Sequence, residues 1–143
     1  MSFEITLVDV WTAELDDRPG TLAEKMEVLQ RAGVNLEFAI LRPSADVMAD
    51  IGLLFVAPVL GAAQCRAAEE AGLRKDASHH AVRVVGPDRP GLVANIARML
   101  ADARINISAI WASALGVQSA LYIRFDSNAE TKRAAQLLTA KLG

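Results

Sequence analysis

The tetrapeptide Asp-Arg-Pro-Gly occurs twice in this sequence, and its residue types suit recognition of a small charged molecule. It stands at residues 17–20 and again at residues 88–91. The Asp carboxylate can hold an ammonium group, and the Gly lets a ligand or a neighbouring backbone approach closely. An amphipathic stretch follows each copy, so the free N–H groups of a helix N-terminus would be available to a carboxylate. Together these groups fit a zwitterion whose two charges lie close together.

The same residues also have a purely structural interpretation. Pro19 and Pro90 suit the first turn of a helix, because proline fixes φ and lacks the N–H that would be unpaired there. Asp17 and Asp88 can cap such a helix by accepting hydrogen bonds from its free N–H groups. On this alternative each tetrapeptide is a turn and a helix start that binds no ligand.

The spacing indicates that the tetrapeptide belongs to an internal repeat. The offset from Asp17 to Asp88 equals the offset from Asn35 to Asn106, and these asparagines stand in Val-Asn-Leu and Ile-Asn-Ile. Two matches at one offset favour a duplicated unit. In each copy the intervening helix carries the Asn away from its own turn. We expect each amide either to reach a ligand held by a neighbouring module or to bond its own backbone.

Both halves predict the same order of elements. A β-branched strand precedes each tetrapeptide, a helix of about three turns follows, and two strands and a second helix complete the half. With one more strand, this β-α-β-β-α order is the ferredoxin-like plan. The expected segments are Ile5–Trp11, a helix ended by Gly33, Leu36–Leu41, Ile51–Ala57 and Ala62–Ala71 in the first half, and His80–Val85, a helix, Ile107–Ala112, Ser119–Phe125 and Ala129–Leu142 in the second.

The last strand of each module is the weak part of this plan. Leu73–Ser78 is a short, polar candidate in the first half, and the second half reaches Gly143 without one. Something must cover that sheet edge, since bare edges invite unwanted pairing, and the long first strand region, Glu4–Leu15, is available for it. The sequence thus predicts an α+β fold of two ferredoxin-like βαββαβ modules in tandem, at residues 1–75 and 76–143, the second lacking its own last strand.

These residues resemble the ACT domain family of small regulatory modules that bind amino acids. The family's turn, helix and Gly-Ile/Val-Asn-Ile segment are similar to both "DDRPGTLAEKMEVLQRAGVNLE" and "PDRPGLVANIARMLADARINIS". The resemblance implies modules that pair side by side with ligand at their interface. Arg104 stands where the family has Gly, and a left-handed conformation there would cost about 1 kcal/mol. The implied ligand-binding residues are Asp17, Arg18, Pro19, Gly20, Thr21, Leu22 and Asn35 in the first copy, and Asp88, Arg89, Pro90, Gly91, Leu92, Val93 and Asn106 in the second.

Three classes of function follow. The resemblance favours a stand-alone regulatory protein that binds an amino acid, forms a homodimer and docks on an enzyme or transporter. The alternative is a structural or oligomerisation module with no small-molecule ligand. An enzyme has the weakest support, because no Ser/His/Asp set, paired general acid and base, or Gly-rich phosphate loop stands out. The one cluster that would suit catalysis is Asp76, His79 and His80.

Composition narrows the remaining classes. The chain has 143 residues, is 52% hydrophobic and carries a formal net charge of −2, which argues against a nucleic-acid partner. The apolar stretch Ile51–Ala63 is too short to span a bilayer, and the N-terminus lacks the basic region of a signal peptide, so we expect a cytoplasmic protein away from membranes. The single cysteine, Cys65, excludes an internal disulfide. No Cys/His cluster has metal-ligand spacing, so neither a metal nor a cofactor is expected.

Overall fold

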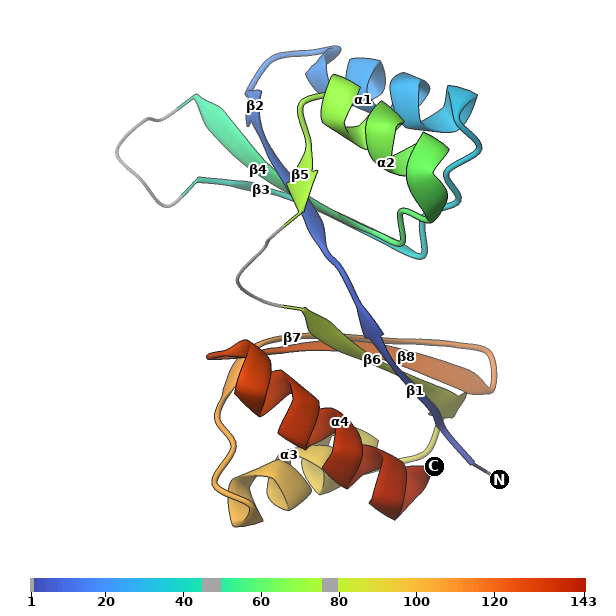
Figure 1. The fold of residues 1–143 in the computed structure, drawn as a ribbon, viewed down its shortest axis with the longest axis vertical. Coiled ribbons are helices and arrows are strands. Elements are labelled where there is room, and N and C mark those ends of the chain that lie inside the picture. The colour runs from blue at the N-terminus through green and yellow to red at the C-terminus, as the bar shows by residue number, and fades with distance from the viewer. Residues whose placement is uncertain (1, 45–49, 76–79) are drawn as a thin grey trace. The chain divides into compact units, whose positions relative to one another are not determined.

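The computed structural model describes residues 2–44, 50–75 and 80–143. They form two compact units, each an antiparallel sheet of four strands with two helices on one face (Figure 1). We call Asp9–Asp76 the inserted unit, and Met1–Val8 together with Ala77–Gly143 the split unit. The α+β fold of two ferredoxin-like modules is therefore confirmed.

The inserted unit follows the βαββαβ order. Its sheet has the strand order β3-β4-β2-β5. Trp11, Ala13 and Leu15 alternate along β2 and pack with Leu29 and Leu54 in one core beneath the helices. The elements are β2 (Trp11–Asp16), α1 (Thr21–Arg31), β3 (Phe38–Pro43), β4 (Ile51–Ala57), α2 (Gly61–Glu70) and the two-residue β5 (Arg74–Lys75).

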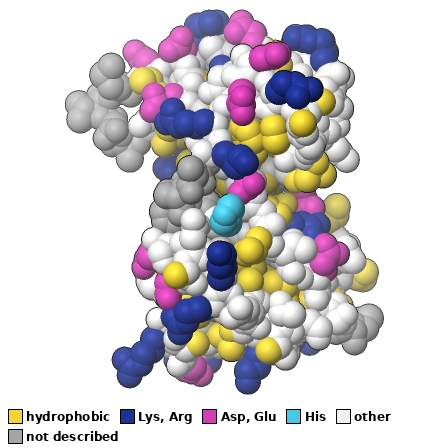
Figure 2. Space-filling view, viewed as in Figure 1, with side chains coloured by type: hydrophobic (Ala, Val, Ile, Leu, Met, Phe, Trp, Pro, Cys, Tyr) yellow, Lys and Arg dark blue, Asp and Glu magenta, His cyan; other side chains and the backbone are white. Residues whose placement is uncertain are grey.

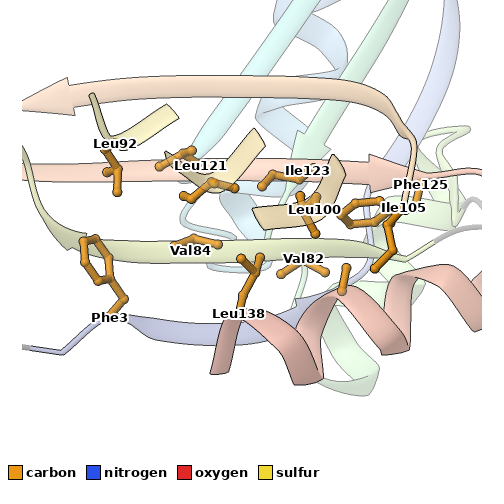
Figure 3. Packing of buried hydrophobic residues seen from close by; sticks show 12 residues of the cluster. Phe3, Val82, Val84, Leu92, Leu100, Ile105, Leu121, Ile123, Phe125 and Leu138 are labelled. Carbon is orange, nitrogen blue, oxygen red and sulfur yellow. The ribbon is translucent and has the colours of Figure 1, made fainter. Parts of the chain in front are cut away.

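The split unit has the same sheet plan, with the strand order β1-β6-β8-β7. Its core joins Val82 and Val84 of β6 to Leu121 of β8, Leu100 of α3 and Leu138 of α4 (Figure 3). The elements are β1 (Glu4–Val8), β6 (Ala81–Pro87), α3 (Leu92–Asp102), β7 (Ile107–Leu115), β8 (Gln118–Phe125) and α4 (Asn128–Leu142).

The N-terminal segment supplies the strand that the second half of the sequence lacks. Strand β1 pairs antiparallel with β6, from Glu4 opposite Val85 to Val8 opposite Ala81. The expected single strand Ile5–Trp11 is therefore wrong, because the chain changes sheets after Val8 and β2 begins at Trp11. The observed units also differ from modules 1–75 and 76–143, since Met1–Val8 belongs with the second half.

The first helix of each unit ends in a left-handed residue. Gly33 follows α1 with φ 77°, as predicted, and Arg104 follows α3 with φ 60°. The backbone bonds match: Gly33 N donates to Gln30 O at 2.9 Å, and Arg104 N donates to Ala101 O at 2.9 Å. The split unit therefore keeps the helix end of its counterpart although a side chain occupies the strained position.

Candidate ligand pockets at the two Asp-Arg-Pro-Gly turns

The glycine of each tetrapeptide is the residue at which the chain turns into the helix. Gly20 has φ 96° and is the N-cap of α1, and Gly91 has φ 84° and is the N-cap of α3. Both conformations are left-handed, which favours glycine over residues with a Cβ. A Cβ built on either glycine would meet no atom within 4 Å, so the space in front of both turns is open.

The prolines and aspartates lie outside the helices. Because the N-caps are Gly20 and Gly91, Pro19 and Pro90 precede the first helical turn instead of occupying it. Within the described residues neither N-cap has a side-chain hydrogen bond. The prediction that Asp17 and Asp88 cap these helices is therefore wrong, since the left-handed glycine, not an aspartate, is the capping residue.

The helix starts leave backbone donors at the turns. The glycine carbonyls accept the first intrahelical bonds, from Glu24 N at 2.9 Å and Asn95 N at 2.8 Å. The N–H groups of the next residues, Leu22 and Val93 among them, have no intrahelical acceptor, as in every α-helix. Leu22 is 37% exposed and Val93 is 45% exposed, so these donors lie at the surface, where the helix dipole favours an anion.

A hollow of about 410 Å³ adjoins the first turn, in the inserted unit. The continuous run of residues 15–22 forms one wall, and Leu41, Arg42 and Pro43 at the end of β3 form another. Gly52 of β4 completes the lining. The hollow therefore includes Asp16 and Asp17 as well as Arg18 and Arg42, which are charges of both signs.

A hollow of about 290 Å³ adjoins the second turn, in the split unit. The turn and the start of α3 contribute Asp88, Arg89 and the run from Gly91 to Ala94. Its strand wall consists of Ala112, Ser113 and Ala114 of β7 with Ser119 and Leu121 of β8, all of them small except Leu121. Equivalent elements thus build both hollows, and the second has the smaller volume and fewer charged residues.

Most of the expected site residues are grouped by the structure, but the asparagines are not. The hollows include Asp17, Gly20, Asp88 and Gly91 with their neighbours, whereas Pro90 is outside the second lining. Asn35 is exposed and lines neither hollow. Asn106 also lies outside both, and its Nδ2 donates to Asp126 Oδ2 at 3.4 Å. Neither amide lines the hollow of its own unit.

The strand walls were missed by inspection of the sequence. Leu41–Pro43 and Ala112–Ala114 carry no motif that would mark them as part of a site. The signal is topological: the second strand of a ferredoxin-like sheet is at the edge, and β3 and β7 are edge strands here. Their residues line the hollows beside the turns, so the sheet order would have identified them.

Charges of both signs surround these sites. Asp17 and Asp88 are exposed, as are Arg18 and Arg89. Across the face drawn in Figure 2, acidic and basic side chains are interspersed on both units. By composition the inserted unit carries a net charge of −5 and the split unit +3. The inserted unit is therefore the more acidic surroundings for a ligand.

Other chemistry has little support in the described residues. Of the cluster considered for catalysis, Asp76 and His79 lie outside them, and neither hollow includes His80. Within the described ranges no group of three or more His, Cys, Asp or Glu side chains could hold a metal ion.

No helix among the described residues is long and apolar enough to cross a membrane.

Two four-stranded units, each with a hollow beside a glycine-capped helix, define a pair of ferredoxin-like modules. The model of the ACT domain family matches residues 79–142 of the chain. That match covers the split unit from β6 to α4, and the inserted unit has the same sheet plan. No curated protein sequence matches the chain significantly.

Solved structures with this fold align with nearly the whole chain. Protein BT0572 from Bacteroides thetaiotaomicron has a TM-score of 0.79 at 19% identity, covering 96% of this chain and 90% of that one. The ligand-free regulatory subunit of aspartate kinase from Thermus thermophilus has a TM-score of 0.63 at 17% identity, covering 98% and 96%. The corresponding subunit from Thermus flavus has a TM-score of 0.56 at 19% identity, with the same coverage. At these identities the likeness concerns the fold.

Proposed function

We propose that this chain is a regulatory protein that binds a free amino acid at its Asp-Arg-Pro-Gly turns. The ACT domain and the likeness to aspartate kinase regulatory subunits support a regulatory role with a small ligand in general. The amino acid is the finer part of the proposal. The observation that carries it is the recurrence of one hollow at both turns, each offering an exposed carboxylate beside free helix N–H groups.

The chemistry of the turns matches the two charges of an amino acid. The helix start can hold an α-carboxylate through N–H groups near Leu22 or Val93. Asp17 or Asp88 can then accept hydrogen bonds from the α-ammonium group. The hollows of about 410 Å³ and 290 Å³ have room for a ligand of this size. A neutral apolar ligand would give no partner to the N–H groups of the helix start or to the aspartate carboxylate.

We further propose that the chain acts as a homodimer in which the asparagines complete the sites. Asn35 and Asn106 are exposed and lie outside the hollows of their own units. We therefore expect their amides to contact ligand held by a second copy of the chain. Ligand held between copies would stabilise the paired state by mass action. Such coupling would let the dimer regulate a separate enzyme or transporter.

A thermal-shift screen of the standard amino acids at millimolar concentration tests the proposal. One or a few of them should raise the melting temperature, and Asp17→Asn or Asp88→Asn should reduce that rise. Glu27→Gln and Asp102→Asn are matched controls, because these acidic residues are exposed on α1 and α3 and line neither hollow. If no amino acid shifts the melting temperature, the amino-acid proposal is wrong.

The oligomerisation alternative makes the opposite prediction for the same residues. A variant with Asp88→Ala and Asn106→Ala should then keep both its association and its regulatory effect. Association measured by analytical ultracentrifugation, together with the ligand screen, separates the two functions. Loss of ligand binding with intact association supports the sensor and excludes a purely structural role.

A further inference from the structure

Phe3 lies at the meeting point of the N-terminal segment, the end of β6 and the second turn. Its side chain is 5% exposed and belongs to the core of the split unit. Its backbone N donates to Leu142 O at 3.0 Å, near the end of α4. Figure 3 shows the ring at the same end of the core as Leu92, the first residue of α3. Phe3 is therefore fixed from several sides beside the candidate site.

The ring occupies the space above a glycine of β6. A Cβ on Gly86 would collide with the Cδ1, Cε1 and Cγ atoms of Phe3. The equivalent residue of the inserted unit, at the offset of the repeat, is Leu15, which is 4% exposed and part of that unit's core. An aromatic ring from a remote segment thus fills the position for which the inserted unit uses its own leucine.

The guanidinium of Arg89 stacks over this ring. The distance from Arg89 Cζ to the ring centroid of Phe3 is 5.3 Å, within the range of a cation–π contact. In the sheet order β1-β6-β8-β7, Phe3 is on the β1 side of β6, whereas the strand wall of the hollow comes from β8 and β7. Arg89 itself lines that hollow, so the contact links Phe3 to the second turn through the Arg89 side chain.

We propose that Phe3 is a positioning residue for the second ligand site: by holding Arg89 it fixes the backbone of the turn that presents Gly91 and Leu92. The effect of Phe3 on ligand binding rests on the proposed function. The positioning of the turn by Phe3 is a property of the protein without ligand. The N-terminal segment is thereby part of the second site although it lines none of the hollow.

The test is a double-mutant cycle on the full chain, read by amide hydrogen exchange without ligand. Phe3→Leu removes the ring, Arg89→Gln removes the cation, and Phe3→Tyr keeps the ring. Each of the first two should raise the exchange rates of Gly91 and Leu92 about two- to fivefold, as for loss of one partly exposed cation–π contact. Arg89→Gln should add little to the exchange rates in the Phe3→Leu background, because the contact that it removes is already absent there. Phe3→Tyr should restore the wild-type rates.

The first turn provides the internal control. Exchange at Gly20 and Thr21 should be unchanged in every variant, and Arg18→Gln should leave it unchanged as well. Additive effects of Phe3→Leu and Arg89→Gln, or unchanged rates at Gly91 and Leu92 in folded Arg89→Gln, would overturn the inference. Arg89 is exposed, so its variant keeps the test decisive even if Phe3→Leu does not fold.

Ligand binding separates this inference from the proposed function. Titration with each standard amino acid should give an affinity about two- to fivefold lower in Phe3→Leu at the second site, matching the change in exchange rates. If no amino acid binds the wild-type chain, the proposed function fails while the exchange data still decide the role of Phe3. If binding is unchanged while the cycle shows coupling, Phe3 positions the turn without serving the ligand, and the inference is overturned.

Discussion

The two units have the same sheet plan, but different segments of the chain complete the sheet and the core of each. In the inserted unit, Leu15 fills the core from its own strand, and the fourth strand is the two-residue β5. In the split unit, Gly86 leaves that space to Phe3, and the fourth strand is β1 from the N-terminal segment. A repeat therefore keeps the position of a core side chain without keeping the segment that supplies it.

The difference extends to the candidate sites. Arg89 stacks on Phe3, whereas within the described ranges no aromatic ring stacks on Arg18. The first hollow is larger and includes Asp16, Asp17 and Arg42, while the strand wall of the second combines small residues such as Ala112 with Leu121. Two sites of common design are thus held by different contacts, and their responses to mutation should differ accordingly.

Deleting residues 2–8 should have the largest effect, and on one unit only. The split unit would lose Phe3 and the whole of β1 from the edge of β6, a loss comparable to the whole stability of a small domain, about 5 kcal/mol or more. Hydrogen exchange should show lost protection in β6 and β8 but retained protection in β2 and β4. Retained protection in β6 would mean that its edge does not need β1.

Replacing the Phe3 and Gly86 arrangement of the split unit by the leucine that the inserted unit uses should give the next largest effect. Phe3→Ala should cost about 3–5 kcal/mol of unfolding free energy, as for other buried aromatics. Gly86→Leu alone should also destabilise, because its side chain collides with the ring. The double variant should recover at least about 1 kcal/mol over the sum of the single changes, as measured by urea unfolding. Strictly additive costs would show that the two positions do not share one space.

Substitutions at the ends of α1 and α3 should have smaller effects on stability, and in opposite directions. Arg104→Gly should stabilise the split unit by about 0.5–1 kcal/mol, since glycine relieves the left-handed strain at φ 60°. Gly33→Ala should destabilise the inserted unit by about 1 kcal/mol at φ 77°. Thermal unfolding followed by residue-resolved signals assigns each change to its unit. A destabilised Arg104→Gly would mean that the Arg104 side chain makes contacts worth more than the strain.

The smallest expected effect concerns one pair of surface charges. Arg98 and Asp102 form an i,i+4 ion pair with an N–O distance of 3.6 Å on α3, and both are exposed. The same helix positions on α1 carry the reversed order, Glu27 and Arg31. Neutralising Arg98 and Asp102, or Glu27 and Arg31, should change the unfolding free energy by about 0.5 kcal/mol or less, with the larger loss on α1, where the order of the charges agrees with the helix dipole. A larger loss on α3 would contradict that orientation effect.

Most of the fold could be predicted from the internal repeat, because its constant offset identifies equivalent positions in the two halves. The bounds of α1 and α3 obey it: Thr21 and Leu92, which begin these helices, are separated by the same offset as Asp17 and Asp88. The role of β1 could not be read in the same way, since strand pairing over a long sequence separation leaves no local pattern. Glu4–Leu15 reads as one long strand region, and only the sheet order divides it between two units.

The parts of the candidate sites that lie in one short segment could be predicted from the sequence. The parts that depend on strand pairing could not. Residues of the turns, such as Asp17 and Gly91, were identified because a helix start has a sequence signature. The edge-strand walls and Phe3 have none, as their positions depend on pairing partners far along the chain. The mistaken assignment of Asp17 as an N-cap has a local cause: glycine in a left-handed conformation occupies that position.

The order of the strands also bears on how the chain folds during synthesis. Glu4 pairs with Val85, and the whole inserted unit, Asp9–Asp76, is made between these two partners. The inserted unit holds all the strands of its own sheet, so it can fold while the rest of the chain is still being made. Residues 2–8 must meanwhile wait as an unpaired strand, and the split unit closes only after β6 has emerged.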